Sequence, residues 1–354
     1  MTQSLLTIST PRGSLFGISL VFLGVLLLLV PACQSCKDRG AKPHEVVVYT
    51  SVDQVFSEPI FRYCEKKTGL SVKAVFDTEE TKSTGVLNRL IAEAAHPQAD
   101  VFWSGDPVRP FILRDKKMLR AYRSTAAADL PKAFKAADGM WTGVAARARV
   151  LLVNTRLVPK DARPQGLADL TDPRWRGRVA IANPLFGTTT MHIAALFTAW
   201  GDIKAKQFLM DLKTNKVRIA TSNGEVRRLV VGGEVAIGLT DTDDAYHAKK
   251  SGAPVAIVYP DQDGLGALVM PTTAVLLARS PNPHGASRLL DCLLGPEVER
   301  RMAMNADHMP LRAGVKTPPL MKGADKIKAM KVDYAKVAAT MVRIQPWLRR
   351  WAGY

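Results

Sequence analysis

Three aspartates, Asp241, Asp243 and Asp244, lie close together directly after a short apolar run that predicts a strand, Val235–Leu239. Carboxylate oxygens are hard ligands for metal ions, and they also pair with ammonium and hydroxyl groups. Aspartate is equally favoured in turns and at helix caps, so spacing alone leaves a solvated turn as the alternative.

Two short polar segments precede predicted helices further along the chain. One is Gly187-Thr188-Thr189-Thr190, and the other is Ser222-Asn223-Gly224. The N-terminus of a helix offers backbone N–H groups and the positive end of the helix dipole, which together bind anions. Both segments would suit phosphate, phosphonate, carbonate or carboxylate, although threonine and serine also begin helices that bind no ligand.

Other polar or aromatic residues occupy positions at strands. Tyr49 and Trp103 end predicted strands and could line a cleft or simply pack in the core. Arg147 and Arg149 alternate with apolar residues, so both point to one face of a strand. That face could be a cleft wall, and the alternative is an exposed surface pair.

Motifs for several classes of enzyme are missing. The six histidines form no H-x-x-x-H, and the chain contains neither G-x-S-x-G nor G-x-x-x-x-G-K-[ST]. A zinc enzyme, a serine hydrolase and an ATPase are therefore unsupported, and we expect no enzymatic activity.

Strand-like and helical segments alternate along most of the chain, which predicts a parallel α/β sheet with right-handed crossovers. Helical spacing indicates a helix after Phe56 that ends at Gly69, a helix that ends at Gly201, and a further helix over Asp202–Leu212. Helices are also expected over most of the chain after Ala278. The predicted strands are Glu45–Thr50, Leu70–Phe76, Val101–Trp103, Val144–Asn154, Val179–Ala182, Val217–Ala220, Val235–Leu239, Val255–Tyr259 and Val269–Ala278.

The first 36 residues indicate export from the cytoplasm. Leu15–Val30 is an uncharged run of 16 residues, which suits the apolar part of a signal peptide better than a spanning helix. Pro31-Ala32-Cys33 follows and resembles a lipoprotein processing site, so we expect cleavage before Cys33 and a lipid on that residue. An uncleaved membrane anchor and a redox-active C-x-x-C formed with Cys36 are the alternatives. With Cys33 lipidated, Cys36, Cys64 and Cys292 remain and allow at most one disulfide.

The chain has 354 residues with 47% hydrophobic and 23% charged residues, which excludes a disordered or collagen-like protein. Its net charge is +17, and residues 311–354 hold ten Lys and Arg against two Asp, or +8 of that excess. A solvated face or an anionic membrane explains this charge as well as nucleic acid does. Export makes a nucleic-acid partner unexpected.

Five blocks of sequence, in order, resemble the bacterial extracellular solute-binding proteins of ABC importers, in particular the ferric-ion-binding branch. The blocks are "VVVYTSVDQ", "YCEKKTGLSVKAVFD", "NRLIAEAAHPQADVFWSGD", "DLTDPRWRGRVAIANPLFGTTT" and "GGEVAIGLTDTDDAYHAKKSGAPVAIVYPDQDGLGALVMPTTAVLL". The resemblance implies a type II periplasmic-binding fold whose two lobes close on a solute by a hinge motion. It also implies permease and ATPase partners.

The resemblance transfers site positions only in part. Asp53 matches a family histidine, Asp106 is next to the place of a family glutamate, and Asp243-Asp244 stand where ferric-binding relatives have two tyrosines. The implied metal ligands are Asp53, Asp243 and Asp244, while Thr188, Thr189, Ser222 and Asn223 match positions for a companion anion. Asp53 and Asp106 could alternatively cap helices.

These features together predict an α/β, two-lobed periplasmic receptor whose lobes are joined by two crossings, at Val144–Val153 and Met270–Leu276. Expected segments are a signal peptide (1–32), a tether (33–44), lobe 1 (45–143 and 272–310), lobe 2 (144–271) and basic C-terminal helices (311–354). We expect a monomer on the periplasmic side of the membrane, with ferric iron or an iron–anion complex as solute. An aminoalkylphosphonate or a sugar phosphate is the alternative.

Overall fold

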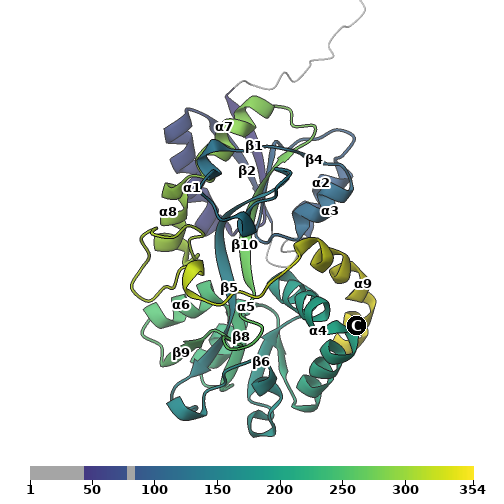
Figure 1. Ribbon diagram of the computed structural model, residues 1–354, viewed down its shortest axis with the longest axis vertical. Helices are drawn as coiled ribbons and strands as arrows, with labels where there is room; N and C mark the ends of the chain where they lie inside the picture. Colours follow the sequence, from purple (N-terminus) through teal and green to yellow (C-terminus); the bar gives the residue numbers. More distant parts are fainter. Residues whose placement is uncertain (1–43, 78–83) are drawn as a thin grey trace, which may run out of the picture. The chain divides into compact units, whose positions relative to one another are not determined.

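The computed structural model describes residues 44–77 and 84–354. The predicted signal peptide, Cys33, Cys36 and nearly all of the predicted tether lie outside these ranges. No helix within the described ranges combines the length and apolar character needed to cross a bilayer. Within these ranges the structure is a mixed α/β protein with two lobes, as the sequence predicted (Figure 1).

Lobe 1 is built on parallel strands in the order β2-β1-β3, with β10 antiparallel beside β3. The strands are fully or partly buried because helices cover both faces of the sheet, which suits their runs of valine and aromatic residues. The elements are β1 (Glu45–Thr50), α1 (Gln54–Thr68), β2 (Ser71–Phe76), α2 (Gly85–Ala92), β3 (Val101–Ser104), α3 (Arg109–Asp115), β4 (Leu119–Arg120), β10 (Val269–Leu277), α7 (Pro283–Leu293) and α8 (Pro296–Ala306).

Lobe 2 repeats this arrangement with three parallel strands in the order β8-β6-β7. Each of these strands is followed by a helix, so the three helices all begin at the carboxyl edge of the sheet. The elements are β6 (Val179–Ala182), α4 (Gly187–Thr214), β7 (Arg218–Ala220), α5 (Asn223–Val231), β8 (Ile237–Asp241), α6 (Thr242–Lys250) and β9 (Val255–Val258).

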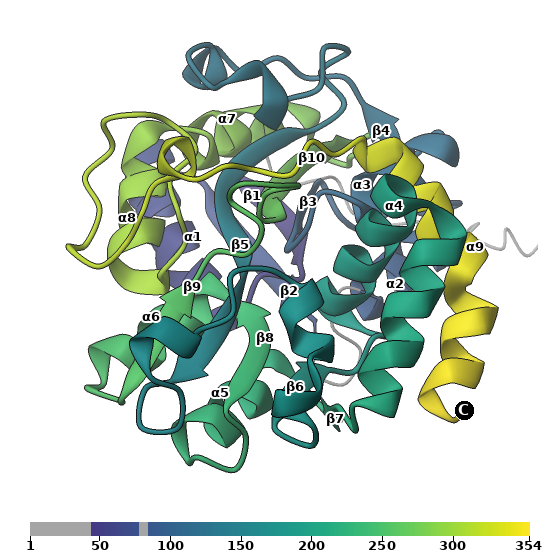
Figure 2. The same cartoon turned by 60° about the horizontal axis from the view of Figure 1, so that its bottom comes forward.

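One long strand, β5 (Thr142–Asn154), belongs to both lobes (Figure 2). Its first half pairs with β10 of lobe 1, and its second half pairs with β8 and β9 of lobe 2. All 13 of its residues are buried. A strand shared in this way fixes the side chains at its centre against both lobes, as expected for the first crossing.

Helix α4 bends at Gly201, whose backbone angles of φ 78° and ψ 166° are not helical. Glycine adopts this conformation at low cost because it has no Cβ. The prediction of one helix that ends at Gly201 and another over Asp202–Leu212 is confirmed.

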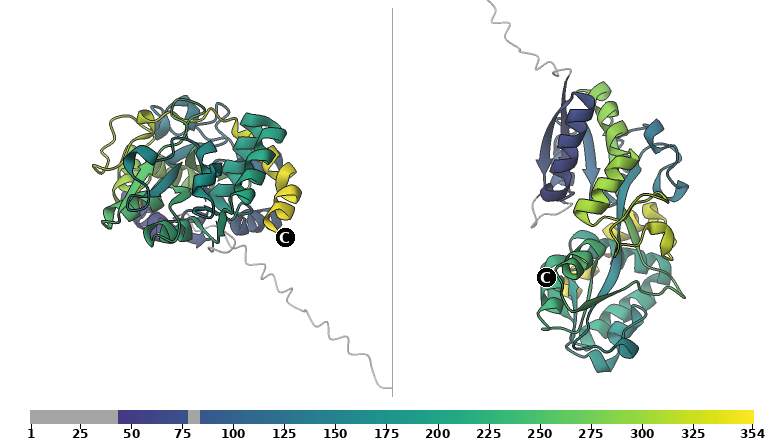
Figure 3. Two further views of the ribbon diagram at one scale, coloured as in Figure 1. Left: turned by 90° about the horizontal axis from the view of Figure 1, so that it is seen from below. Right: turned by 90° about the vertical axis from the view of Figure 1, so that its left-hand side faces the viewer.

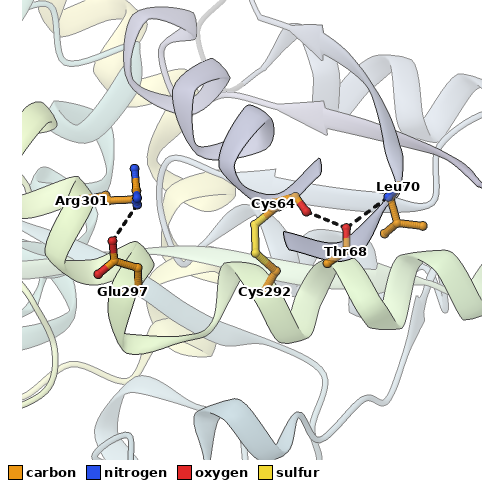
Figure 4. Close-up of a disulfide and its surroundings, with 6 residues drawn as sticks. All are labelled: Cys64, Thr68, Leu70, Cys292, Glu297 and Arg301. Atoms are coloured by element: carbon orange, nitrogen blue, oxygen red, sulfur yellow. Dashed lines mark hydrogen bonds and ion pairs between the residues drawn. A yellow bond between two sulfur atoms is a disulfide. The ribbon is translucent and has the colours of Figure 1, made fainter. Parts of the chain in front are cut away.

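A disulfide joins Cys64 of α1 to Cys292 of α7, two helices that pack side by side in lobe 1 (Figure 4). Both cysteines are buried. Next to the bridge, the Thr68 hydroxyl donates to the carbonyl oxygen of Cys64 at 2.6 Å and accepts from the Leu70 backbone N–H at 3.3 Å. Of the bridges that the sequence left open, the structure forms this one.

The C-terminal region differs from the expected run of helices. Residues 307–333 are irregular apart from isolated β-bridges at Met309 and Ala329 and one short 3-10 turn at Ala324–Lys326, and a single helix follows, α9 (Tyr334–Ala352). Helix α9 packs along α4 of lobe 2 and also contacts α3 of lobe 1 (Figure 3). Proline and glycine punctuate 310–323, which explains why helical spacing there did not produce helices.

Candidate functional site

A cleft of about 930 Å³ lies between the two lobes, at the carboxyl ends of the lobe 2 strands. Parallel α/β folds bind ligands at this edge. Seven of the eight solute-site residues predicted from the sequence line it. They are Asp53, Thr188, Thr189, Ser222, Asn223, Asp243 and Asp244.

The N-termini of α4, α5 and α6 all reach this cleft. Thr188 lies in the first turn of α4, and Asn223 is the first residue of α5. The Ser222 hydroxyl caps α5 by accepting from the Glu225 N–H at 3.1 Å. Three helix dipoles therefore present their positive ends to one wall of the cleft.

Asp241 lies at the centre of this wall, and it is almost fully buried, with 1% of its surface exposed. Its carboxylate accepts from Arg149 Nη1 at 2.7 Å, from the Thr188 hydroxyl at 2.8 Å and from Asn223 Nδ2 at 3.1 Å. Burial alone would raise the pKa of Asp241, but Arg149 and Arg147 hold it below its usual value. Asp241 thus ties β8 to the first residues of α4 and α5.

Arg147 and Arg149 are not an exposed surface pair, because Arg147 lines the cleft and Arg149 is buried behind its wall. Arg149 is fully buried and also donates from Nη1 to Thr188 at 3.2 Å and to Asn223 Oδ1 at 3.1 Å. Arg147 lines the cleft, with Nη1 at 3.4 Å from Asp241 Oδ2 and 3.5 Å from Asp243 Oδ2. Their alternation on β5 was visible in the sequence. The structure adds that every residue of β5 is buried, so neither arginine lies on the outer surface.

Arg147 also connects the lobes. Its Nη2 donates to the carbonyl oxygen of Gly105 in lobe 1 at 2.7 Å. Burial opposes its charge, yet the carboxylates of Asp243 and Asp241, with smaller contributions from Asp53 and Asp106, raise its pKa above the usual value. The guanidinium is therefore a fixed positive charge on the cleft wall.

Asp244 faces the cleft beside Asp243 on the first turn of α6. Arg227 Nη1 lies 3.4 Å from Asp244 Oδ1, and the Thr240 hydroxyl donates to Oδ2 at 3.3 Å. Burial, together with the charges of Asp243 and Asp241, raises the pKa of Asp244 to about 7. This carboxyl group therefore changes its charge near neutral pH.

The raised pKa of Asp244 predicts a pH-dependent stability. The folded protein keeps this proton up to about pH 7, whereas an unfolded aspartate releases it near pH 4. Between these two pH values the folded state therefore binds more protons than the unfolded state. Its free energy of unfolding should fall as pH rises from about 4 to about 7, by up to about 1.4 kcal/mol per pH unit. Urea unfolding at pH 5.5 and at pH 7.5 should show that the free energy of unfolding differs less between the two pH values for Asp244→Asn than for the wild type.

The control for this experiment is Asp115→Asn, which changes an exposed aspartate outside the cleft. It should keep the wild-type difference between the two pH values. Equal pH profiles for Asp244→Asn and the wild type would contradict the assignment of this proton to Asp244.

Asp106 does not belong to the cleft, in contrast to the position expected from the resemblance. It is buried, its Oδ2 accepts from Arg109 Nη1 at 2.8 Å, and its Oδ1 accepts from the Val108 N–H at 2.9 Å. These contacts use the carboxylate to order the turn after β3 and the start of α3. Asp106 therefore has the structural role that the sequence left as its alternative.

Tyr49 and Trp103 also pack in the core and do not line the cleft. The Tyr49 hydroxyl donates to Glu93 at 2.8 Å, and Trp103 Nε1 donates to the Thr272 hydroxyl at 3.1 Å. Both side chains are at most 1% exposed.

Sequence reasoning missed several residues of the cleft because only tertiary structure brings them there. Lys250 of α6 and Asp307 after α8 form an ion pair at 2.5 Å between the two lobes. The Tyr354 hydroxyl accepts from Asn183 Nδ2 at 3.4 Å, which brings Tyr354, after α9, to the loop that connects β6 to α4. Arg227, which pairs with Asp244, had no local sequence signal.

The donor groups do not form a ready metal centre in this arrangement. Within residues 44–77 and 84–354, no cluster of three or more His, Cys, Asp or Glu side chains is placed to hold a metal ion. The cleft carboxylates Asp241, Asp243 and Asp244 each have an arginine within 3.5 Å.

Residues 97–337 match the family model described as bacterial extracellular solute-binding protein. The chain belongs to this family. Members are solute-binding proteins of transport systems and not enzymes, and the resemblance inferred from the sequence blocks is thereby confirmed.

Several relatives of this solute-binding protein have been described. Iron uptake protein A1 of Synechocystis is 25% identical over 309 residues, which cover 84% of this chain and 83% of the relative. A putative 2-aminoethylphosphonate-binding periplasmic protein of Salmonella paratyphi A is 25% identical over 294 residues, 81% of this chain and 79% of the relative. Iron-bound HitA from Pseudomonas aeruginosa has the same fold, with a TM-score of 0.78, 24% identity, and coverage of 88% of this chain and 99% of HitA.

Proposed function

We propose that this solute-binding protein is the extracytoplasmic receptor of an ABC importer, and that its solute is a small organic anion that also carries an ammonium or hydroxyl groups. The observation that carries the proposal is the composition of one cleft wall, where Arg147 and three helix N-termini lie beside Asp243 and Asp244. A permease and a separate ATPase would be its partners, since the chain has no phosphate-binding loop of its own.

The anionic end of such a solute would bind near the N-termini of α4 and α5. Thr188, Thr189 and Ser222 supply hydroxyl groups there, and Arg147 supplies a fixed positive charge. Phosphonate and phosphate groups suit this combination because guanidinium and backbone N–H donors match their oxygens.

The opposite end of the solute would meet carboxylates. Asp53 from lobe 1 and Asp243 and Asp244 from lobe 2 line the same cleft, so a bound solute contacts both lobes. Closure then follows because a solute that touches both lobes stabilises the closed state over the open one. The Lys250–Asp307 ion pair would add a contact at the rim of the closed state.

A ferric ion with a companion anion is the second candidate solute. Relatives named for iron uptake or ferric binding favour it, as do the hard oxygen donors of Asp53, Asp243 and Asp244. An anion on the helix N-termini would complete the coordination of such an ion.

The proposed location is the periplasmic side of the membrane, with a lipid on Cys33 and the receptor acting as a monomer. The periplasmic names of several relatives support the compartment. The lipid remains a prediction from the sequence.

Thermal shift separates the two solutes. A ligand at 100 times its dissociation constant should stabilise the folded state by about 2.7 kcal/mol. We expect 2-aminoethylphosphonate or a sugar phosphate to raise the melting temperature, and Asp243→Asn with Asp244→Asn to remove that rise. The control Asp115→Asn with Asp161→Asn, which also removes two aspartates from outside the cleft, should keep it. If neither these compounds nor ferric citrate changes the melting temperature, the receptor proposal fails.

Ferric salt provides a second readout. Tyr354 is the only tyrosine among the described residues that line the cleft. A ferric site built on paired phenolates, which the sequence resemblance implies for the ferric-binding branch, would be coloured. We expect stabilisation by ferric citrate, if it occurs, to develop no visible phenolate band. A strong red or orange colour would show that tyrosines bind the metal.

A further inference from the structure

The end of lobe 1 that faces away from the cleft is organised around Asp100. Its Oδ2 accepts from the N–H of Val47 in β1 at 2.8 Å, and its carbonyl oxygen accepts from the N–H of Leu277 in β10 at 3.1 Å. Its Oδ1 accepts from the Asn282 N–H at 2.6 Å, and the Asn282 side chain reaches the carbonyl oxygen of Glu45 at 2.8 Å. The start of β1 and the end of β10 therefore share one edge, the distal edge, visible at the purple start of the chain in Figure 1.

Five exposed basic side chains lie at this distal edge. Lys66 and Lys67 end α1, which leads directly into the start of β2, and β2 is parallel to β1. Lys116 and Lys117 follow α3, and Arg279 follows β10, where the Ala278 N–H donates to Met118 O at 2.9 Å. Lysines at helix ends also offset helix dipoles, but Arg279 follows a strand and has no such role.

Two of the acidic side chains beside them are paired with other arginines. Glu93 lies 2.8 Å from Arg89, and Asp115 lies 3.5 Å from Arg114. The other acids at this edge are Glu45, Glu65 and Asp100, three against the five basic side chains, so the distal edge still carries a net positive charge.

A cavity of about 300 Å³ opens between these basic groups. Lys116, Lys117 and Arg279 border it together with one acid, Glu93, which is paired with Arg89, and much of the remaining wall is apolar. Cationic groups around an apolar hollow match the phosphate and the glycerol or first acyl carbons of a phospholipid. A freely soluble anion would gain nothing from the apolar part.

The chain that precedes β1 leaves from the same edge. Eleven residues separate Cys33 from Glu45, and an extended chain of that length spans at most about 40 Å. Membrane attachment through the N-terminal segment therefore brings the distal edge toward the lipid, while the cleft lies at the other end of lobe 1.

From this juxtaposition we propose that the distal edge of lobe 1 docks on an anionic phospholipid surface, with the cavity beside Lys116 and Arg279 taking up a lipid headgroup. The proposal goes beyond solute binding and does not depend on which solute the cleft takes.

The test uses the full chain, held on vesicles by its own N-terminal segment. Vesicles are made of phosphatidylcholine alone or with one third phosphatidylglycerol, and an amine-reactive reagent labels lysines before mass spectrometry. We expect Lys67 and Lys116 to react at least threefold more slowly on the anionic vesicles, with the difference lost in 0.5 M salt. Lys160 of lobe 2, which is also exposed, should react equally on both.

Two variants with the same change in net charge locate the contact. Lys67→Glu with Lys116→Glu should make the labelling of Lys66 and Lys117 equal on the two kinds of vesicle. Arg349→Glu with Arg350→Glu, at the far end of α9, should preserve the difference. Equal labelling of Lys67 and Lys116 on both vesicles in the wild-type chain would overturn the proposal. So would a loss of protection caused by the α9 variant alone, which would assign the contact to the C-terminal region.

Discussion

Replacing Arg149 by methionine should destabilise the protein by about 3–5 kcal/mol and abolish solute binding. The reason is that Arg149 is fully buried and donates to the buried carboxylate of Asp241 at 2.7 Å. Removal of one partner of a buried ion pair leaves the other as an uncompensated charge in a medium that solvates it poorly. Urea unfolding at pH 7 measures the loss of stability, and thermal shift with 2-aminoethylphosphonate measures binding.

A double variant tests whether the unpaired charge is the cause. Arg149→Met with Asp241→Asn removes both charges, so it should be more stable than Arg149→Met alone, and the two substitutions should show a clear coupling energy. Arg62→Met is the control, since this arginine forms an exposed ion pair on α1, and such pairs contribute about 1 kcal/mol or less. A stability of Arg149→Met within about 1 kcal/mol of the wild type would contradict the buried-pair interpretation.

Loss of the disulfide should produce the second large effect. Cys64 and Cys292 are 228 residues apart in sequence, so their bridge restricts a long stretch of the unfolded chain. Removing a bridge of this kind costs about 2–4 kcal/mol, mainly because the unfolded state gains conformational freedom. We expect Cys64→Ala with Cys292→Ala to lower the urea midpoint accordingly while solute binding persists, because both residues lie outside the cleft.

The reduced wild-type protein provides the matched comparison. Unfolding under dithiothreitol should give the same midpoint as the double alanine variant, since both lack the same covalent link. A wild-type midpoint that does not change on reduction would show that the bridge is absent in solution or does not contribute to stability.

The basic plan of the fold could be predicted because it depends on local patterns. Buried parallel strands are continuous apolar runs, and the helices between them show helical spacing, so the alternation of β and α elements is visible without tertiary contacts. Gly201 marked the bend of α4 because only glycine readily adopts a φ of 78°. The C-terminal region after Ala306 was less predictable, since its irregular path follows contacts with other elements and not a repeat of its own.

The candidate site was predicted in part for a related reason. Thr188, Asn223 and Asp243 are at helix starts after strands, and the carboxyl ends of parallel strands meet at one edge, so local order alone brings them together. Asp106 likewise follows a strand and precedes a helix, yet its carboxylate accepts a hydrogen bond from its neighbour Arg109 at 2.8 Å. Whether a strand-end aspartate faces solvent or an arginine depends on side-chain packing, which has no local pattern.

The sequence by itself determined the alternation of strands and helices, the family, and the polar segments at the carboxyl ends of strands, because each of these depends on residues that are neighbours in the chain. Tertiary structure decided the electrostatics of the cleft. It placed Arg147 and Arg149 against Asp241 and Asp243, which lie more than 90 residues later, and it raised the pKa of Asp244 to about 7 by burying it beside like charges. Charge interactions act through space and depend on burial, so residues distant in sequence set the chemistry of the site.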